Sequence, residues 1–203
     1  FELVGVPFNL TTFELNNGTN NGYNPPSLPA NCILSIFRYN GSRFEETVND
    51  NGVWTPAIGD ESFTKLESAR GYWFETNSQC NVSFAGKVPT SNITKKINTT
   101  FSVNGWYSPY SPTLGNVTAY GDPIKVQPAG AVTDLFRYNA SKASSNPQQG
   151  GFQGVHYFSS YGWWPFFGDE DFNKLEPGKG YYFRTPNANS TNQVNWTMDP
   201  TFS

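Results

Sequence analysis

Acidic residues stand side by side at three points of the chain, and paired carboxyl groups are the residues that hydrolyse glycosidic bonds. The acidic groups are Glu45-Glu46, Asp60-Glu61 and Asp169-Glu170-Asp171. A glycosidase needs two carboxyl groups placed across one sugar. However, the element Gly-Asp-Glu occurs twice in the same sequence context. A motif duplicated together with its surroundings favours a structural role, in which the acids cap the positive end of a short turn.

Residues for other kinds of catalysis are sparse. His156 is the single histidine, no Gly-x-Ser-x-Gly motif occurs, and adjacent acids alone do not form a Ca²⁺ cage. Lys65 and Lys174 could in principle form isopeptide bonds, but pairing with Glu67 and Glu176 is the plainer account. We therefore predict no catalytic residue, no metal ligand and no cofactor. A secreted glycoside-active enzyme is the least favoured function.

Asparagine supplies the strongest chemical signal. Asn-x-Ser/Thr, the acceptor motif for N-linked glycans, occurs ten times, where chance in a chain of this composition would give roughly four. The alternative is that Asn, Ser and Thr serve only as turn formers. The excess, spread along the whole chain, favours real acceptors and therefore secretion. The predicted glycosylation sites are Asn9, Asn17, Asn40, Asn81, Asn92, Asn98, Asn116, Asn139, Asn189 and Asn195.

The two cysteines fit an oxidising extracellular compartment. Each of them directly precedes a strand-like apolar segment. A bridge between them would join the starts of two strands, and the chain-entropy model values closure of such a loop at ~4 kcal/mol. We predict a Cys32–Cys80 disulfide rather than two buried free thiols.

Composition favours many short strands joined by tight turns. Aromatic residues reach 17%, with 19 Gly and 15 Pro. Aromatic side chains pack on pleated sheets, and Gly and Pro set turn dihedrals. The predicted fold class is therefore all-β. The chain has 13 basic against 16 acidic residues and no basic run, which argues against a nucleic-acid partner. No apolar run is long enough to predict a membrane span.

An internal repeat organises the chain. Residues 37–42 match residues 136–141 at five of six positions, and residues 56–76 match residues 165–185 at 12 of 21. The second copy has ten extra residues, which we assign to a long exposed loop at 142–154. Because units of this size form two layers around one core, we predict two tandem, related β-sandwich domains of Ig-like or Greek-key type. Their predicted bounds are residues 1–90 and 91–203.

Each copy has the same predicted plan. An opening strand and an apolar strand ending in Phe-Arg-Tyr-Asn are followed by a hairpin, a Trp-x-Pro element, one helical turn and two closing strands. The helical turn should direct two apolar side chains into the core at i, i+3 spacing. The inward pairs would be Phe63 with Leu66, and Phe172 with Leu175.

Aromatic clusters at residues 106–110 and 163–167 could stack on sugars. Core packing accounts better for most of these residues, with one Trp of each copy (Trp54, and Trp163 or Trp164) buried. Phe166 and Phe167 replace Ala57 and Ile58 of the first copy. These two are the better candidates for contact with a partner.

The copies differ at their openings. An alternating strand at residues 93–103 precedes Gly105-Trp106, whereas the first copy starts at once, at Phe1 rather than Met. We interpret this start as a mature terminus. By analogy, the first unit lacks one strand or has a terminal segment free to leave, and an unpaired sheet edge can pair with another chain. We therefore hypothesise head-to-tail polymerisation with a donor strand of Phe1, Glu2, Leu3, Val4, Gly5, Val6, Pro7 and Phe8. Pro7 cannot donate to a ladder, so the inserted strand would end there.

The element Leu-Glu-x-x-x-Gly-Tyr-aromatic-Phe, with the Gly-Val and Gly-Trp pairs, resembles β-sandwich repeats of archaeal and bacterial surface proteins. In its full architecture the chain resembles the subunit of archaeal thread filaments. This resemblance implies that an N-terminal strand is donated to the neighbouring identical subunit and that glycans coat the filament. We expect an extracellular cell-surface filament used in adhesion, with surface glycans as a second class of partner. The alternative is a monomeric carbohydrate-binding or adhesin module.

Overall fold

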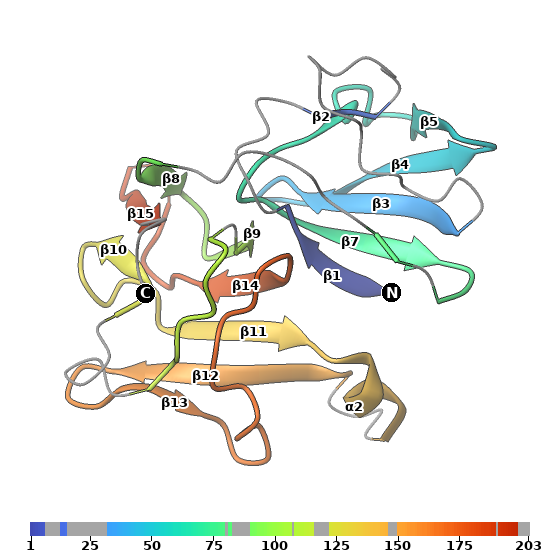
Figure 1. Cartoon of the computed structure of the whole chain (residues 1–203). Coiled ribbons are helices and arrows are strands. Elements are labelled where there is room, and N and C mark those ends of the chain that lie inside the picture. The colour runs from blue at the N-terminus through green and yellow to red at the C-terminus, as the bar shows by residue number, and fades with distance from the viewer. Residues whose placement is uncertain are drawn as a thin grey trace.

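The computed structural model describes residues 1–6, 13–15, 32–79, 81–82, 90–106, 108–115, 122–145, 150–189 and 191–198. Antiparallel sheets dominate these residues, with one short helix, α2 (Ala140–Ser145), among them (Figure 1). The predicted all-β fold is confirmed. No helix within the described ranges has the length and apolarity needed to cross a membrane.

The first copy of the repeat forms a five-stranded antiparallel sheet. Its strand order is β1 (Glu2–Gly5), β7 (Gly71–Thr76), β3 (Ile33–Tyr39), β4 (Phe44–Asp50) and β5 (Val53–Pro56). A separate two-stranded ladder joins β2 (Phe13–Glu14) to β6 (Lys65–Leu66). The strand β3 ends in the Phe-Arg-Tyr motif, as the sequence predicts.

The second copy forms a five-stranded sheet in the equivalent order. The strands are β9 (Phe101–Gly105), β14 (Gly180–Arg184), β11 (Asp134–Tyr138), β12 (Phe152–Phe158) and β13 (Gly162–Pro165). A further three-stranded sheet contains β10 (Lys125–Gln127), β15 (Val194–Met198) and β8 (Ile93–Ile97). The segment predicted as a single strand at 93–103 is thus two strands, β8 and β9, separated by a turn.

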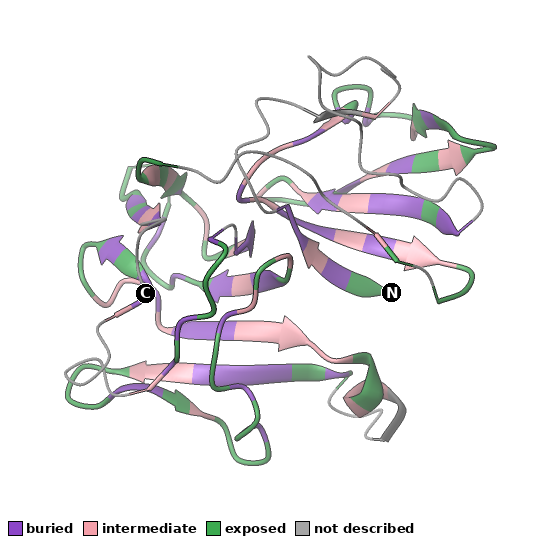
Figure 2. Cartoon of the chain, in the orientation of Figure 1, coloured by how far each residue is buried: buried purple, intermediate pink, exposed green. Residues whose placement is uncertain are grey.

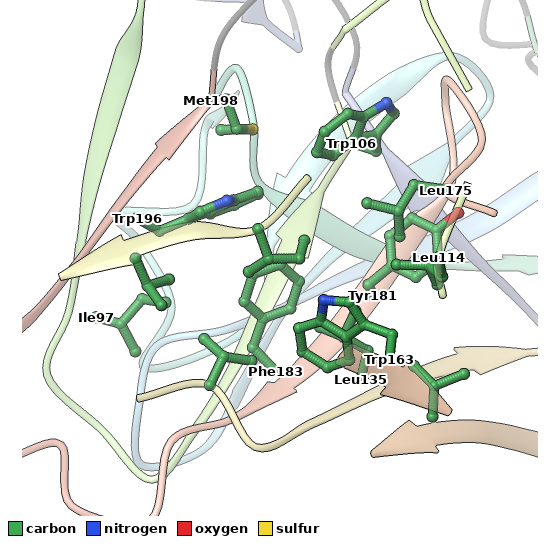
Figure 3. Close-up of a cluster of buried hydrophobic side chains, with 14 of the residues drawn as sticks. Ile97, Trp106, Leu114, Leu135, Trp163, Leu175, Tyr181, Phe183, Trp196 and Met198 are labelled. Atoms are coloured by element: carbon green, nitrogen blue, oxygen red, sulfur yellow. The ribbon is translucent and has the colours of Figure 1, made fainter. Parts of the chain in front are cut away.

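The core of the second copy lies between its two sheets, in a sandwich-like arrangement. Val194, Trp196 and Met198 are the buried, alternate residues of β15 and belong to one cluster with side chains of the five-stranded sheet. The ring of Trp196 lies 4.6 Å from that of Phe183, between centroids (Figure 3). Alternation of this kind is how a strand buries one face. Figure 2 shows the buried residues of β3 and β12 as purple bands along these strands.

The first copy has its own buried cluster, which includes Trp54, Phe63 and Leu66. Trp54 and Trp163 are both buried, which confirms the predicted core Trp at this repeat position; the second copy also buries Trp106 and Trp196. The division into two domains stays a prediction, because Ala69 of the first copy packs within the core of the second.

The helical turn predicted after Gly-Asp-Glu is wrong. Asp60 N donates to Ala57 O at 2.9 Å and Phe63 N donates to Asp60 O at 2.8 Å, which makes two successive β-turns. Gly59 is the third residue of the first turn and has a φ of 87°. The inward packing is nevertheless confirmed, since all four predicted apolar side chains are fully buried: Phe63, Leu66, Phe172 and Leu175.

The long exposed loop predicted at 142–154 is also wrong at both ends. Helix α2 occupies its start, while Gln153 and Gly154 lie buried within β12. The strand registers place nine of the ten extra residues between β11 and β12 and one after β12. Strand β12 must keep the length of β4 to pair with its neighbours, so the extra residues are confined to the connections on either side of it.

The two copies meet at a pair of equivalent glycines, each of which donates a backbone hydrogen bond to the other copy. Gly5 N donates to Gly178 O at 2.9 Å, and Gly105 N donates to Ala69 O at 3.2 Å. A Cβ atom on Gly5 would stand 2.3 Å from Lys179 O, and one on Gly105 would stand 2.7 Å from Arg70 O. Only glycine allows this approach of two backbones.

Candidate functional site

The outer faces of the two five-stranded sheets carry aromatic side chains at equivalent positions. Side chains alternate along a strand, so Phe37 and Tyr39 of β3 lie opposite the buried Arg38. The strand registers define five equivalent pairs across the copies. We call these ten residues the aromatic face: Phe1 and Phe101, Phe37 and Phe136, Tyr39 and Tyr138, Phe44 and Phe152, Trp73 and Tyr182.

Trp73 holds the two halves of the aromatic face together. Its indole Nε1 donates at 2.7 Å to the hydroxyl of Tyr182, the equivalent residue of the second copy. Its ring centroid lies 4.9 Å from that of Tyr138 and 5.9 Å from that of Phe152, both in edge-on geometry. Edge-to-face pairs of this kind are favourable beyond the area they bury.

Two adjoining hollows open on the aromatic face. Their volumes are about 540 and 490 Å³, and among the described residues only the ten aromatic side chains line them. Exchanging the two copies converts the lining of one hollow almost completely into that of the other. Phe1, Phe44 and Phe101 remain 61%, 44% and 45% exposed. These exposed rings make the aromatic face the candidate surface for contact with a partner.

Two polar pockets flank the aromatic face, one on each side of the junction between the copies. The first, of about 300 Å³, lies between the Tyr39–Asn40 corner with Glu67 and Arg70 and the second-copy segment 95–99. The second, of about 290 Å³, joins Tyr138, Asn139, Glu176 and Lys179 to residues 1–3 of the first copy. These are the first and second junction pockets.

Charged side chains supply the hydrogen-bonding groups of the first junction pocket. Arg70 donates to Glu67 at 2.6 Å and to the Tyr39 carbonyl at 2.9 Å. Burial and, second, the charge of Arg70 together lower the pKa of Lys95 to about 7, while Glu67 acts in the opposite direction. In the second junction pocket Lys179 pairs with Glu2.

The duplicated acids Asp60 and Asp169 each connect a turn to a strand by a hydrogen bond. Asp60 Oδ2 accepts from Glu46 N, and Asp169 Oδ2 accepts from Gly154 N, each at 2.8 Å. The hydrogen bond from Glu46 and the nearby Arg43 lower the pKa of Asp60. The acids therefore have structural partners, although the turn that they hold is not the helical one expected.

Glu45 belongs to a buried pair rather than to an acidic cluster. It accepts hydrogen bonds from Arg38 and from Asn40, and these interactions lower its pKa although burial acts to raise it. In the second copy Gln153 takes the place of Glu45 and accepts from Arg137 at 2.9 Å.

The predicted lysine pairs are found in one copy only. Lys174 Nζ lies 3.8 Å from Glu176, as expected. In the first copy Glu67 pairs with Arg70 instead of Lys65. Arg70, directly before β7, forms a charge-assisted hydrogen bond with Glu67.

His156 has a partly exposed side chain, 36% accessible to solvent. It lies on β12, opposite Asp134 of β11, with Nδ1 2.7 Å from Asp134 Oδ1. Burial raises the pKa of Asp134, but hydrogen bonds from His156 and Thr133 and the charge of Arg184 lower it overall. Sequence reasoning missed this pair because its members are 22 positions apart.

The predicted glycan acceptors lie at accessible positions wherever the structure describes them. Asn139 is half-buried; the other six are exposed: Asn40, Asn81, Asn92, Asn98, Asn189 and Asn195. Asn9, Asn17 and Asn116 lie outside the described residues. Asn40 and Asn98 line the first junction pocket and Asn139 lines the second.

The described part of the predicted donor segment pairs with a strand of its own chain. Glu2 to Gly5 pair with β7, and Leu3 and Val6 are buried. Pro7 and Phe8 lie outside the described residues. Cys32 is buried and disulfide-bonded; its predicted partner Cys80 also lies outside the described residues.

Among the described residues no cluster of three or more metal-ligating side chains occurs. No family model, no curated protein and no solved structure matches this chain.

Proposed function

We propose that this chain is the structural subunit of an extracellular, N-glycosylated filament that assembles head-to-tail by β-strand donation and serves adhesion. The observation that supports this best is the position of β1. This strand is the last in its sheet, with Leu3 and Val6 buried and Phe1 on the aromatic face. A strand in that position provides both a pairing edge and an apolar contact.

Strand exchange would replace the β1 of one subunit by that of its neighbour at little cost. The same four register pairs with β7 would form, from Glu2 opposite Phe74 to Gly5 opposite Gly71. Exchange of an identical element between copies keeps the contacts of the single chain. A donated strand also brings the neighbouring subunit next to the aromatic face, which would cover the exposed rings.

The accessible acceptors support the extracellular part of the proposal. Glycans at exposed asparagines add polar bulk to the surface and would leave the sheet edges to strand pairing. The subunit would consist of two tandem β-sandwich domains, residues 1–90 and 91–203, with no catalytic role.

Electron microscopy of protein sheared from cells tests the proposal directly. Filaments should be present, and a chain lacking residues 1–8 should give dispersed subunits. A synthetic peptide of residues 1–8 should then bind the truncated chain, which shows that the vacated edge accepts a strand from outside. Dispersed subunits in the untruncated sample, or filaments that survive the truncation, would refute strand donation.

The aromatic face favours a second candidate, a monomeric carbohydrate-binding module. Exposed rings can stack on the apolar faces of sugars. A glycan array probed with the monomer, beside a Phe44→Ser Phe152→Ser variant, distinguishes the two functions. Binding that is lost in the variant, without filaments in the native sample, would favour the module.

A further inference from the structure

Asn40 and Asn139 are glycan acceptors at equivalent positions in the two copies. Each ends a Phe-Arg-Tyr-Asn segment and begins an Asn-x-Ser motif. Asn17 and Asn116 keep the same spacing in the sequence but lie outside the described residues. An acceptor kept in both copies is one whose surroundings are also kept, so its glycan would meet the same environment twice.

The side chains of Asn40 and Asn139 form equivalent hydrogen bonds. The side-chain nitrogen of Asn40 donates to Glu45 Oε1 at 2.9 Å, and that of Asn139 donates to Gln153 Oε1 at 3.1 Å. The side-chain oxygen of each accepts a backbone N–H two residues on, from Ser42 or Ser141, at 3.0 Å. An amide nitrogen has two hydrogens. One can therefore remain in the buried hydrogen bond while the other is replaced by a sugar.

Both asparagines form part of a junction-pocket wall, so a sugar attached there starts inside the pocket. Each pocket has one wall from each copy of the repeat: β8 and β9 face Asn40, and residues 1–3 face Asn139. At about 300 and 290 Å³ they are at the small end of the range for ligand pockets. This size suits the stem of a glycan rather than a whole branched one.

The chemistry of the junction pockets also fits a sugar better than that of the aromatic hollows does. A pyranose presents hydroxyl groups, which need fixed donors and acceptors, and an apolar face, which packs on a ring. The first junction pocket offers Glu67, Arg70 and Tyr39. The second offers Glu176, Lys179 and Tyr138. The aromatic hollows are lined by rings alone among the described residues.

We propose that the first sugars of the N-glycans on Asn40 and Asn139 fill the two junction pockets and bridge the two copies of the repeat. The inference depends on the glycosylation that forms part of the proposed function, but not on strand donation. Each glycan stem then contacts both copies and restrains the junction on either side of the crossing at Gly5 and Gly105.

Asn189 provides a matched control. Its side-chain oxygen accepts the backbone N–H of Thr191 at 3.0 Å, the same local turn as at Asn40, but it lines neither junction pocket. The substitutions Ser42→Ala, Ser141→Ala and Thr191→Ala each remove one acceptor motif and leave the asparagine in place. Loss of the turn-forming asparagine therefore does not complicate the comparison.

The test uses the glycoprotein from its native host, with occupancy determined site by site by peptide mass spectrometry. Under native conditions an amidase or endoglycosidase should release the glycans of Asn40 and Asn139 about tenfold more slowly than that of Asn189, because release requires local opening. Ser42→Ala and Ser141→Ala should lower the denaturant midpoint, while Thr191→Ala should not.

Three results would overturn the inference: unoccupied Asn40 and Asn139, equal release at all three sites, or midpoints unchanged by Ser42→Ala and Ser141→Ala. Micrographs of the same variants separate this outcome from the filament proposal. Filaments formed by chains with freely released glycans would leave strand donation standing and remove the glycan bridge. Dispersed subunits with protected glycans would remove strand donation and leave the glycan bridge standing.

Discussion

The two copies of the repeat share the contacts that make the fold. Glu67 N donates to the Tyr72 hydroxyl, and Glu176 N donates to the Tyr181 hydroxyl, each at 2.7 Å. The guanidinium groups lie over equivalent rings, Arg38 over Phe63 at 4.5 Å and Arg137 over Phe172 at 4.8 Å. Hydrogen bonds and ring contacts duplicated to within a few tenths of an ångström belong to the scaffold.

The copies differ in what they add to that scaffold. Cys32 and the buried carboxylate of Glu45 occur in the first copy, whereas the His156–Asp134 pair occurs in the second. At one turn tip, Ile58 and Phe167 are both fully exposed, but only the second copy presents a ring. Residues that differ between copies are free of the shared folding constraint, so they are where partner contacts can diverge.

The largest expected effect comes from breaking the junction that both copies build. Gly5→Ala and Gly105→Ala place a methyl group within 2.7 Å of backbone atoms of the other copy, so the two copies must separate. Each change should destabilise the chain by roughly 3 kcal/mol, as overpacking against backbone does. Guanidinium unfolding measures the loss; a cost below about 1 kcal/mol would mean that the junction yields.

The next effect concerns the buried pair that the second copy lacks. Glu45→Ala leaves Arg38 buried without its carboxylate and should cost about 3 kcal/mol. Glu45→Gln imitates Gln153 and should cost clearly less. Because the pKa of Glu45 is lowered on folding, its contribution is present above the unfolded pKa of about 4.3 and lost as pH falls through the folded value. The free energy of unfolding, measured between pH 3 and 7, should therefore depend less on pH in Glu45→Gln than in the unchanged chain. An equal pH dependence in both would exclude Glu45 as its source.

Lys95 on β8 provides a pH effect of the same sign in the neutral to alkaline range. Its pKa of about 7 in the folded chain lies below the unfolded value of about 10.4. The unfolded chain therefore binds more protons between these values, and stability should rise with pH across that window. Because Lys95 is only half-buried, solvent screening reduces this rise to roughly 2 kcal/mol, which Lys95→Met should abolish. Chemical denaturation at pH 7, 8.5 and 10 would detect it, and an unchanged slope would assign the rise to other groups.

The smallest effect tests the equivalence of Ala69 and Gly178. Ala69 has φ of 57° and Gly178 has φ of 77°, both in the left-handed region. Gly178→Ala meets no atom within 4 Å, so only the backbone conformation opposes it, at about 1 kcal/mol. Comparing the thermal unfolding of Gly178→Ala with that of Gly105→Ala separates this conformational cost from a steric one. A loss as large as that of Gly105→Ala would show that the two turns differ more than their angles indicate.

The sequence predicts the scaffold well, because alternation and duplication are local signals. Trp54, Trp163 and the inward Phe63 and Leu66 follow from the repeat alone. The aromatic face does not, although Phe37 and Tyr39 stand out in the sequence. Which way the two sheets face each other is decided by the glycine crossing, and no local pattern encodes that angle.

The errors have physical causes of the same kind. A run of Asp-Glu before apolar residues fits a helix start and a turn pair equally well, and the carboxylate of Asp60 is used by Glu46 N on another strand. The length of an insertion likewise does not show that part of it will pair. Gln153 and Gly154 belong to β12 because the neighbouring β11 requires a partner along its whole length.

The reciprocal hydrogen bonds at Gly5 and Gly105 have an evolutionary consequence. Each copy offers the same surface to the other, which is the arrangement of an isologous dimer. This implies that duplication and fusion captured an ancestral homodimer of single repeats, after which each half could diverge separately. A single repeat, residues 91–203, would then pair with itself in sedimentation experiments, and Gly105→Ala would leave it monomeric. On this account the tandem chain is a fused homodimer of single repeats rather than a single domain that gained residues.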